Sequence, residues 1–211
     1  MKLNGLKVIS MKIKAIVVGY GDRGSVYSNY AITNPDKFEV VGVVDPNPFK
    51  QALCKEKFNL KDSQIFSNID DCLKAKPECD LFINTTMDQY HYEIMKAILN
   101  AKYNLLTEKP IVGDKNQLLE LKSLAEKNNC QVFVCHVLRY TPFYATIKKM
   151  LLENKIGKIF SIQMDEHVGI AHYGGSYVRG KWNNEEKCMS SFLLAKSCHD
   201  IDIMCWLNNT T

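Results

Sequence analysis

Short runs of apolar and β-branched residues alternate with longer segments of helical periodicity up to about residue 135. The runs that predict strands cover residues 13–18, 38–44, 64–66, 80–83, 103–106 and 131–135. The segments that predict helices cover residues 23–33, 48–58, 70–74, 88–101 and 115–128. Strands that are apolar on both faces and separated by helices join through right-handed crossovers into a parallel sheet. The pattern therefore predicts an α/β fold with a doubly wound parallel sheet.

The rhythm of the chain changes after residue 137. A predicted helix over 142–153 precedes a predicted strand over 158–165, and a glycine- and aromatic-rich stretch leads to a last predicted helix over 190–207. This order is typical of the start of an α+β domain. We therefore predict a first domain over residues 1–137 and a partial second domain over 138–211. Since no closing strands follow, we expect the chain to be part of a longer fold.

The composition is that of an ordinary globular protein, with 46% hydrophobic and 24% charged residues in a chain of 211. A net charge of +4, with lysines scattered rather than grouped in a basic block, argues against a nucleic-acid partner. No apolar run approaches the ~20 residues of a membrane span, and the first ten residues lack the apolar core of a signal peptide. Eight cysteines without CxxC or Cys/His ligand spacing predict reduced thiols, no metal site and a cytoplasmic location.

A GxGxxG sequence, Gly19-Tyr-Gly21-Asp-Arg-Gly24, lies between the first predicted strand and its helix. In this position Gly19 permits a tight turn, Gly21 lets the backbone approach a pyrophosphate and Gly24 allows close helix–strand packing. The N-terminus of the helix adds N–H donors for the phosphates. The turn, which includes Asp22 and Arg23, therefore predicts a Rossmann dinucleotide site. Arg23 either reaches a phosphate or faces solvent, and glycines that only pack a helix on a strand are the alternative.

Asp45 ends the second predicted strand, where a carboxylate can accept both hydroxyls of a nucleotide ribose. Its negative charge would repel a 2′-phosphate. We therefore expect NAD as the cofactor, with NADP as the second choice.

Several further segments resemble, in their order along the chain, the motifs of the glucose–fructose oxidoreductase/inositol dehydrogenase family (Gfo/Idh/MocA). They are Asn84-Thr-Thr86 with His91, Glu108-Lys109-Pro110, Arg139-Tyr-Thr-Pro142 and Ser197-Cys-His-Asp-Ile-Asp202. The glycine turn is shared by many Rossmann proteins, whereas the EKP and HDID segments together are far more specific. The resemblance covers essentially the whole chain.

The resemblance implies an NAD(P)-dependent dehydrogenase that acts on the CH–OH group of a sugar- or polyol-like substrate. It implies a Rossmann domain followed by a domain built on an open antiparallel sheet, through which the full-length protein forms a homo-oligomer. Lys109 and His199 would handle the hydroxyl proton while a hydride passes to or from the nicotinamide. The cofactor side would also include Thr85, His91 and Glu108.

The last helix departs from the family motif at two positions. The motif has an aspartate four residues before the histidine and a glycine two residues before it, whereas this chain has Ala195 and Ser197. An Asp–His partnership therefore cannot form from position 195. We infer that Lys196 takes the place of the missing carboxylate as a substrate or phosphate contact, which makes the site cationic. Arg139, Tyr140 and Asp202 are further candidate substrate contacts.

Helical spacing also predicts which side of this last helix is buried. The apolar positions i, i+4, i+7 and i+11 form one stripe, made of Leu194, Cys198, Ile201 and Cys205. Lys196 and His199 are then expected on the opposite side, with Asp202 as a neighbour of His199.

Structural alternatives remain open for these candidates. His199 is alternatively a surface histidine paired with Asp202, and Lys109 part of a plain Glu–Lys surface pair. Lys196 either contacts substrate or pairs with Asp200, four residues further along the helix. His91 either caps or packs its helix or contacts the nicotinamide. Two other functions also compete with a dehydrogenase. One is a glycosidase in which bound NAD oxidises the substrate transiently, and the other is a nucleotide-binding sensor or remnant without activity.

Overall fold

The computed structural model describes residues 11–209. The first ten residues, for which we expect no signal peptide, lie outside the described part. Contacts within the chain divide it into two compact units. Unit 1 holds the residues up to Thr86 together with Glu93–Leu106 and Ser123–Val132, and unit 2 holds Met87–Tyr92, Thr107–Lys122 and the residues from Phe133 onwards. The predicted division into domains at residue 137 stays a prediction.

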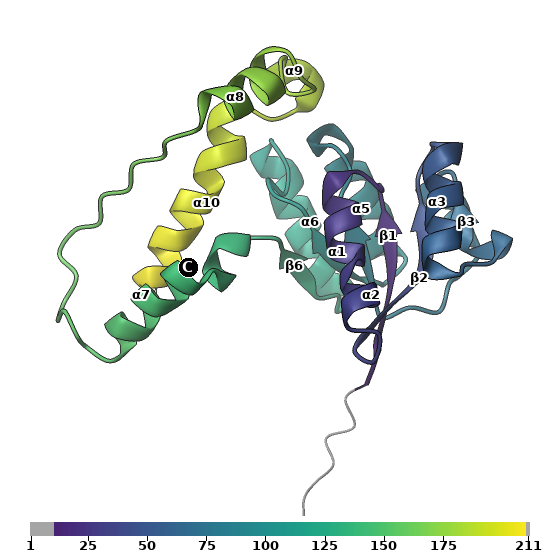
Figure 1. Ribbon diagram of the computed structural model, residues 1–211, viewed down its shortest axis with the longest axis horizontal. Helices are drawn as coiled ribbons and strands as arrows, with labels where there is room; N and C mark the ends of the chain where they lie inside the picture. The colour runs from purple at the N-terminus through teal and green to yellow at the C-terminus, as the bar shows by residue number, and fades with distance from the viewer. Residues whose placement is uncertain (1–10, 210–211) are drawn as a thin grey trace, which may run out of the picture. The chain divides into compact units, whose positions relative to one another are not determined.

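Six strands form one sheet in the order β3-β2-β1-β4-β5-β6, so the strand order reverses between β1 and β4. Figure 1 labels β1, β2, β3 and β6 of this sheet. The strands are β1 (Ile13–Val18), β2 (Phe38–Val44), β3 (Ile65–Phe66), β4 (Leu81–Asn84), β5 (Asn104–Thr107) and β6 (Val132–Val134). β1 pairs in parallel with β2 and with β4, and β2 pairs in parallel with β3. This is the strand order of the Rossmann fold, in which ligands bind where the order reverses. The prediction of a doubly wound parallel sheet is confirmed.

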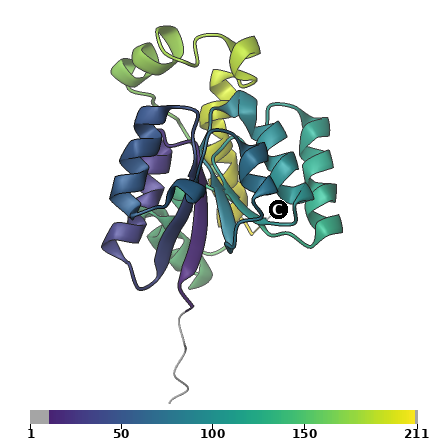
Figure 2. The same ribbon diagram turned by 90° about the vertical axis from the view of Figure 1, so that its right-hand side faces the viewer.

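Helices lie on both sides of the sheet (Figure 2). They are α1 (Asp22–Ser28), α2 (Tyr30–Thr33), α3 (Pro48–Phe58), α4 (Ile69–Lys74), α5 (His91–Asn100) and α6 (Lys115–Asn128), with 3-10 turns η1 (Asp62–Gln64), η2 (Asp88–Tyr90) and η3 (Val137–Tyr140). Because both faces are covered, Ile16, Val17 and Phe82 in the central strands are fully buried. This is why these strands are apolar at successive positions rather than alternating ones.

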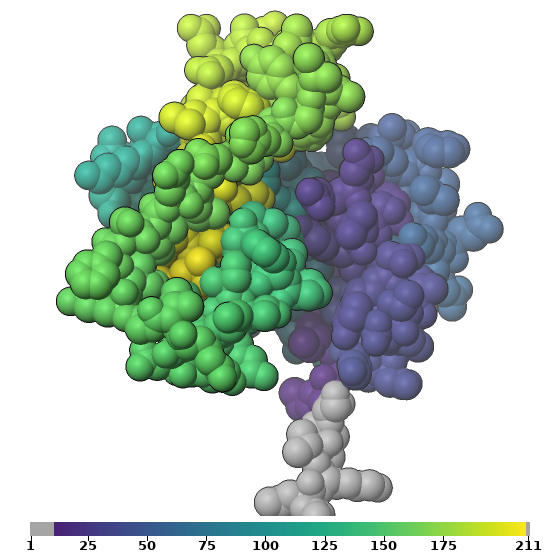
Figure 3. Space-filling model, turned by 60° about the vertical axis from the view of Figure 1, so that its left-hand side comes forward, coloured from purple at the N-terminus to yellow at the C-terminus, as the bar shows by residue number. Residues whose placement is uncertain are grey.

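The regular elements in the described part of unit 2 beyond β6 are helices and helical turns. It contains α7 (Pro142–Leu152), α8 (Ile170–Tyr173), the π-helical turn η4 (Gly174–Val178), α9 (Glu185–Cys188) and α10 (Phe192–Leu207). The predicted helices over 142–153 and 190–207 are confirmed. The predicted strand over 158–165 is wrong, because this segment is extended without pairing along the surface of unit 2 (Figure 3). A strand needs a neighbour to satisfy its backbone groups, and none pairs with it in the described residues. The open antiparallel sheet stays a prediction.

The buried side of α10 also differs from the prediction. Ala195, Ile203 and Leu207 are its buried residues, whereas Ile201, from the predicted stripe, is 57% exposed. His199, spaced four residues from both Ala195 and Ile203, lies on the buried side rather than opposite it.

No helix in the described part of the chain is long and apolar enough to cross a membrane. Among residues 11–209 there is also no cluster of three or more His, Cys, Asp or Glu side chains that could hold a metal ion.

Candidate functional site

Each glycine of the turn in unit 1 is required for a different physical reason. Gly19 has φ = +84°, and a Cβ there would lie 2.9 Å from Cγ2 of Thr86. A Cβ on Gly24 would lie 2.3 Å from the carbonyl oxygen of Gly19 and 2.8 Å from Oγ1 of Thr85. Both positions therefore exclude any side chain, since real Cβ contacts are longer than this. These two glycines fix the path of the backbone.

Gly21 differs because no atom lies within 4 Å of the place where its Cβ would be. Gly21 is the N-cap of α1, and the space next to its Cα is open. A nucleotide diphosphate needs such an open cradle of backbone at a helix N-terminus, so the turn fits the group. Asp22 and Arg23 follow it as exposed residues in the first turn of α1.

Asp45 is buried, and both of its carboxylate oxygens accept main-chain hydrogen bonds. The N–H of Tyr20 donates to Oδ2 at 2.7 Å and the N–H of Asn47 donates to Oδ1 at 2.9 Å. Nζ of Lys50 lies 3.7 Å from Oδ2. The carboxylate thus joins the glycine turn to the start of α3, and a ribose would use the second lone pair of each oxygen.

Thr85 closes the same turn from β4. Its hydroxyl donates to the carbonyl oxygen of Gly19 at 2.5 Å, and its N–H donates to the carbonyl oxygen of Val18 at 2.8 Å. The structure therefore places Thr85 behind the turn, where it holds the turn in shape.

In unit 2 the Glu108-Lys109-Pro110 segment follows β5, with a cis peptide bond between Lys109 and Pro110. His91, which is fully buried, lies behind it, and its Nδ1 is 2.8 Å from the carbonyl oxygen of Pro110. Since a carbonyl only accepts, this Nδ1 carries the proton. The contact favours a packing role for His91. Glu108 is buried, and its carboxylate accepts the N–H of Lys109 at 3.1 Å.

Lys109 reaches α10 with its ammonium group. Its Nζ donates to the main-chain carbonyl oxygen of Ala195 at 3.0 Å. His199 is one turn further along the same helix, and burial, followed by the positive charge of Lys109, lowers the pKa of His199. The structure therefore brings together the two residues that the family motifs imply for proton handling.

His199 is half-buried, and its Nδ1 atom is buried without a hydrogen-bond partner in the described residues. Burial lowers the pKa of His199 to about 4, and the charges of Lys109, His136 and Lys196 act in the same direction, against Asp202. The imidazole is therefore neutral at pH 7 and able to accept a proton.

Asp202 and Arg139 pair with each other. Nε of Arg139 donates to Oδ2 of Asp202 at 2.7 Å, and Nη2 donates to Oδ1. Arg139 therefore holds both oxygens of Asp202, which disfavours the alternative in which His199 is a surface histidine paired with Asp202. Tyr140, which follows Arg139 in the sequence, is 85% exposed.

Nζ of Lys196 lies 2.7 Å from Nε2 of His172, which accepts the hydrogen bond as a neutral imidazole. The charge of Lys196, followed by burial, lowers the pKa of His172. The same ammonium lies 5.7 Å from the ring centroid of Tyr177. Lys196 is thus held next to the aromatic stretch before α9.

One residue of this cluster was missed by the sequence analysis. His136 lies two residues after the end of β6, and its ring centroid is 5.8 Å from that of His199. The available signal is its position, because polar residues at the carboxyl ends of parallel strands face the ligand edge of the sheet.

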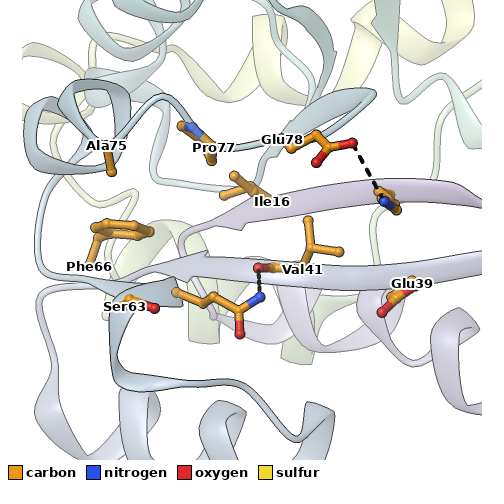
Figure 4. A pocket seen from close by; sticks show the side chains of 10 residues that line it. Ile16, Glu39, Val41, Ser63, Phe66, Ala75, Pro77 and Glu78 are labelled. Carbon is orange, nitrogen blue, oxygen red and sulfur yellow. Dashed lines mark hydrogen bonds and ion pairs between the residues drawn. The ribbon is translucent and has the colours of Figure 1, made fainter.

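A cavity of about 320 Å³ lies elsewhere in unit 1, over the N-terminal halves of β1 and β2 (Figure 4). Lys14 and Glu39 are among its lining residues. It contains none of the candidate residues.

Residues 13–136 match the model of the Gfo/Idh/MocA family, which is described as an oxidoreductase family with an NAD-binding Rossmann fold. The chain belongs to this family, as the motifs predict. NAD is the cofactor in that description, in agreement with our expectation.

Similar proteins include the putative oxidoreductase YteT of Bacillus subtilis, 31% identical over 176 residues, which cover 80% of this chain and 40% of that protein. The inositol 2-dehydrogenase/D-chiro-inositol 3-dehydrogenase of Lactiplantibacillus plantarum is 27% identical, over 93% of this chain and 52% of that protein. A solved scyllo-inositol dehydrogenase from Lactobacillus casei, with bound NAD(H) and scyllo-inositol, has the same fold, with a TM-score of 0.76 at 20% identity over 94% of this chain and 56% of that one. The chain thus spans about half the length of the relatives it matches.

Proposed function

We propose that the chain is part of an NAD-dependent oxidoreductase that transfers a hydride between nicotinamide and a sugar- or polyol-like alcohol. The family description and the relatives named as inositol dehydrogenases support this class. The observation that carries the proposal is the contact of Lys109 with the carbonyl oxygen of Ala195, on the helix that bears His199.

An alcohol is a poor hydride donor until its O–H proton is removed. His199, neutral because burial lowers its pKa to about 4, is the group that accepts this proton. Lys109 is the cation that stabilises the alkoxide as it forms. Bound NAD would supply the hydride acceptor, and the residues of this chain supply the placement.

The cofactor site is tested with Gly21→Ala, because a Cβ at this position extends into the open space that the diphosphate would fill. We expect the affinity for NAD, measured by calorimetry, to fall at least ~10-fold. Gly169→Ala is the matched control, since its Cβ would also meet no atom within 4 Å. Equal affinities of the two variants would remove the glycine turn from the cofactor site.

The preference for NAD over NADP is tested with Asp45→Asn. The amide keeps the size of the side chain but removes the charge that repels a 2′-phosphate. We expect the ratio of the two affinities to move towards NADP. An unchanged ratio would contradict the ribose assignment.

The reaction is tested by NADH absorbance with a panel of polyols and sugars, which separates a dehydrogenase from a glycosidase that releases aglycone without NADH. Lys109→Met is expected to lower turnover at least ~100-fold while the affinity for NAD stays nearly unchanged. Turnover equal to that of the unaltered chain would exclude Lys109 from the mechanism.

Three further expectations stand as proposals. Residues 138–211 contribute to a substrate-binding domain, the full-length protein is a homo-oligomer, and its location is cytoplasmic. Light scattering of the full-length protein tests the second of these.

A further inference from the structure

His136 and His199 form an edge-to-face pair of imidazoles in unit 2. Their ring centroids are 5.8 Å apart and the rings are inclined by 80°. The two residues come from different elements, since His136 precedes η3 and His199 lies in α10. The contact therefore depends on how these elements pack, and it is absent from any local sequence motif.

Both rings leave the same kind of atom unsatisfied. Nδ1 of His136 and Nδ1 of His199 are buried and have no hydrogen-bond partner within residues 11–209. Buried polar atoms without partners are costly and uncommon, so two on adjacent rings call for an explanation. Sites that bind or move a proton are one place where such atoms are kept.

Charged groups lie near both rings of the pair. His136 faces Asp202, with 3.8 Å between Nε2 and Oδ1, and also Arg139, Lys109 and Glu108. His199 faces Lys109, Lys196 and Asp202. Because Arg139 holds both oxygens of Asp202, the carboxylate is fixed beside His136.

We propose that His136 is a positioning residue for His199, and that the two imidazoles share one proton and reject a second. The inference rests on the proposed function, in which His199 accepts the proton of the substrate hydroxyl. A proton on one ring raises the cost of a proton on the other, since like charges at this separation repel. A proton on either ring therefore opposes protonation of the other, and the fixed Asp202 stabilises the single charge once His199 has accepted the proton.

The experiment is a titration of the histidine ring carbon resonances by NMR in the whole 211-residue chain, as it stands and with His136→Phe. Phenylalanine keeps an aromatic ring against His199 but removes the second titrating group. We expect the curve of His199 to change from two steps to one, because interacting groups titrate as a pair. We also expect its apparent pKa to rise by about 0.5, since one source of positive charge is lost.

The matched control is His167→Phe, at an exposed histidine of the same unit. It should leave the titration of His199 unchanged. If His136→Phe does not fold, His136→Asn replaces it, since it also removes the titrating ring. A single-step curve in the unaltered chain, or curves of His199 that superimpose with and without His136, would overturn the proposal.

Calorimetry of the same samples with NAD separates this proposal from the proposed function. A paired titration without NAD binding would contradict the oxidoreductase and leave the histidine pair standing as a proton-sharing unit. NAD binding with independent titrations would contradict only the pair.

Discussion

Around the glycine turn of unit 1, buried polar side chains bind main-chain groups, whereas in unit 2 the Nδ1 atoms of two neighbouring imidazoles have no partner in the described residues. The hydrogen bonds of Asp45 and Thr85 hold the turn in shape. The Nδ1 atoms of His136 and His199 make no hydrogen bond to the described residues. The comparison teaches that the first site is made by backbone geometry and the second by the state of its side chains.

The two units also differ in how many large apolar side chains are fully buried in their cores. Phe82, Ile16 and Met95 are fully buried in unit 1, whereas Ile203 is the fully buried large aliphatic side chain of unit 2 in the described residues. Unit 1 should therefore respond most to changes of volume, and unit 2 to changes of charge.

The largest effect is expected for Gly24→Ala in unit 1. A Cβ 2.3 Å from the carbonyl oxygen of Gly19 forces the backbone to move, which should lower the free energy of unfolding by about 3 kcal/mol. Urea unfolding followed by circular dichroism measures it. Gly21→Ala, whose Cβ has open space, should cost less than about 1 kcal/mol. Similar losses for both variants would break the distinction between packing and cradle glycines.

A smaller effect is expected from pH, and it belongs to unit 2. The pKa of His199 is about 4 in the folded chain against 6.5 in the unfolded chain, so between these values the unfolded chain binds more protons. The free energy of unfolding should therefore fall as the pH drops from 6.5 to 4, by about 1–2 kcal/mol after solvent screening is allowed for. His199→Gln should remove most of this slope in urea titrations at several pH values; an unaltered slope would assign the effect to other groups.

The pair of Arg139 and Asp202 should contribute less. Its two hydrogen bonds are partly buried, with side-chain exposures of 37% and 9%. A double-mutant cycle with Arg139→Met and Asp202→Asn should give a coupling energy of about 1 kcal/mol. Additive losses, measured by urea unfolding, would show that the two side chains do not support each other.

The smallest effect is expected for an ion pair of unit 1, between Lys55 and Asp62. Their side chains are 46% and 90% exposed. Because water and salt screen such a pair, Asp62→Asn should change the free energy of unfolding by less than about 0.5 kcal/mol. A loss as large as that for Arg139→Met would remove the contrast in charge sensitivity between the units.

The sheet and the glycine turn were predictable because their signals are local. β1 is apolar at successive positions and ends at Gly19, and these facts stand next to each other in the sequence. The buried side of α10 was not predictable in this way. The apolar residues of α10 surround most of the helix, so periodicity does not select a buried side. The contacts that do select it come from Lys109 and Arg139, which are far away in the chain. They are made on the side that carries Ala195 and Asp202.

The partner of Asp202 and the contact of His136 with His199 likewise depend on residues more than sixty positions apart. The predicted strand over 158–165 failed for a related reason. Its alternating composition is suited to a sheet, but pairing requires a second strand, and a sequence pattern does not supply one.

The acceptor that holds Lys109 is a main-chain carbonyl, so it does not depend on which side chain occupies position 195. An aspartate at that position would add a negative charge near the ammonium, whereas alanine leaves only the dipole of the peptide group. The lysine consequently keeps its place while its charge is less neutralised by the protein. A loss of one carboxylate from the helix therefore changes the electrostatic potential that a substrate meets without releasing the residue that meets it.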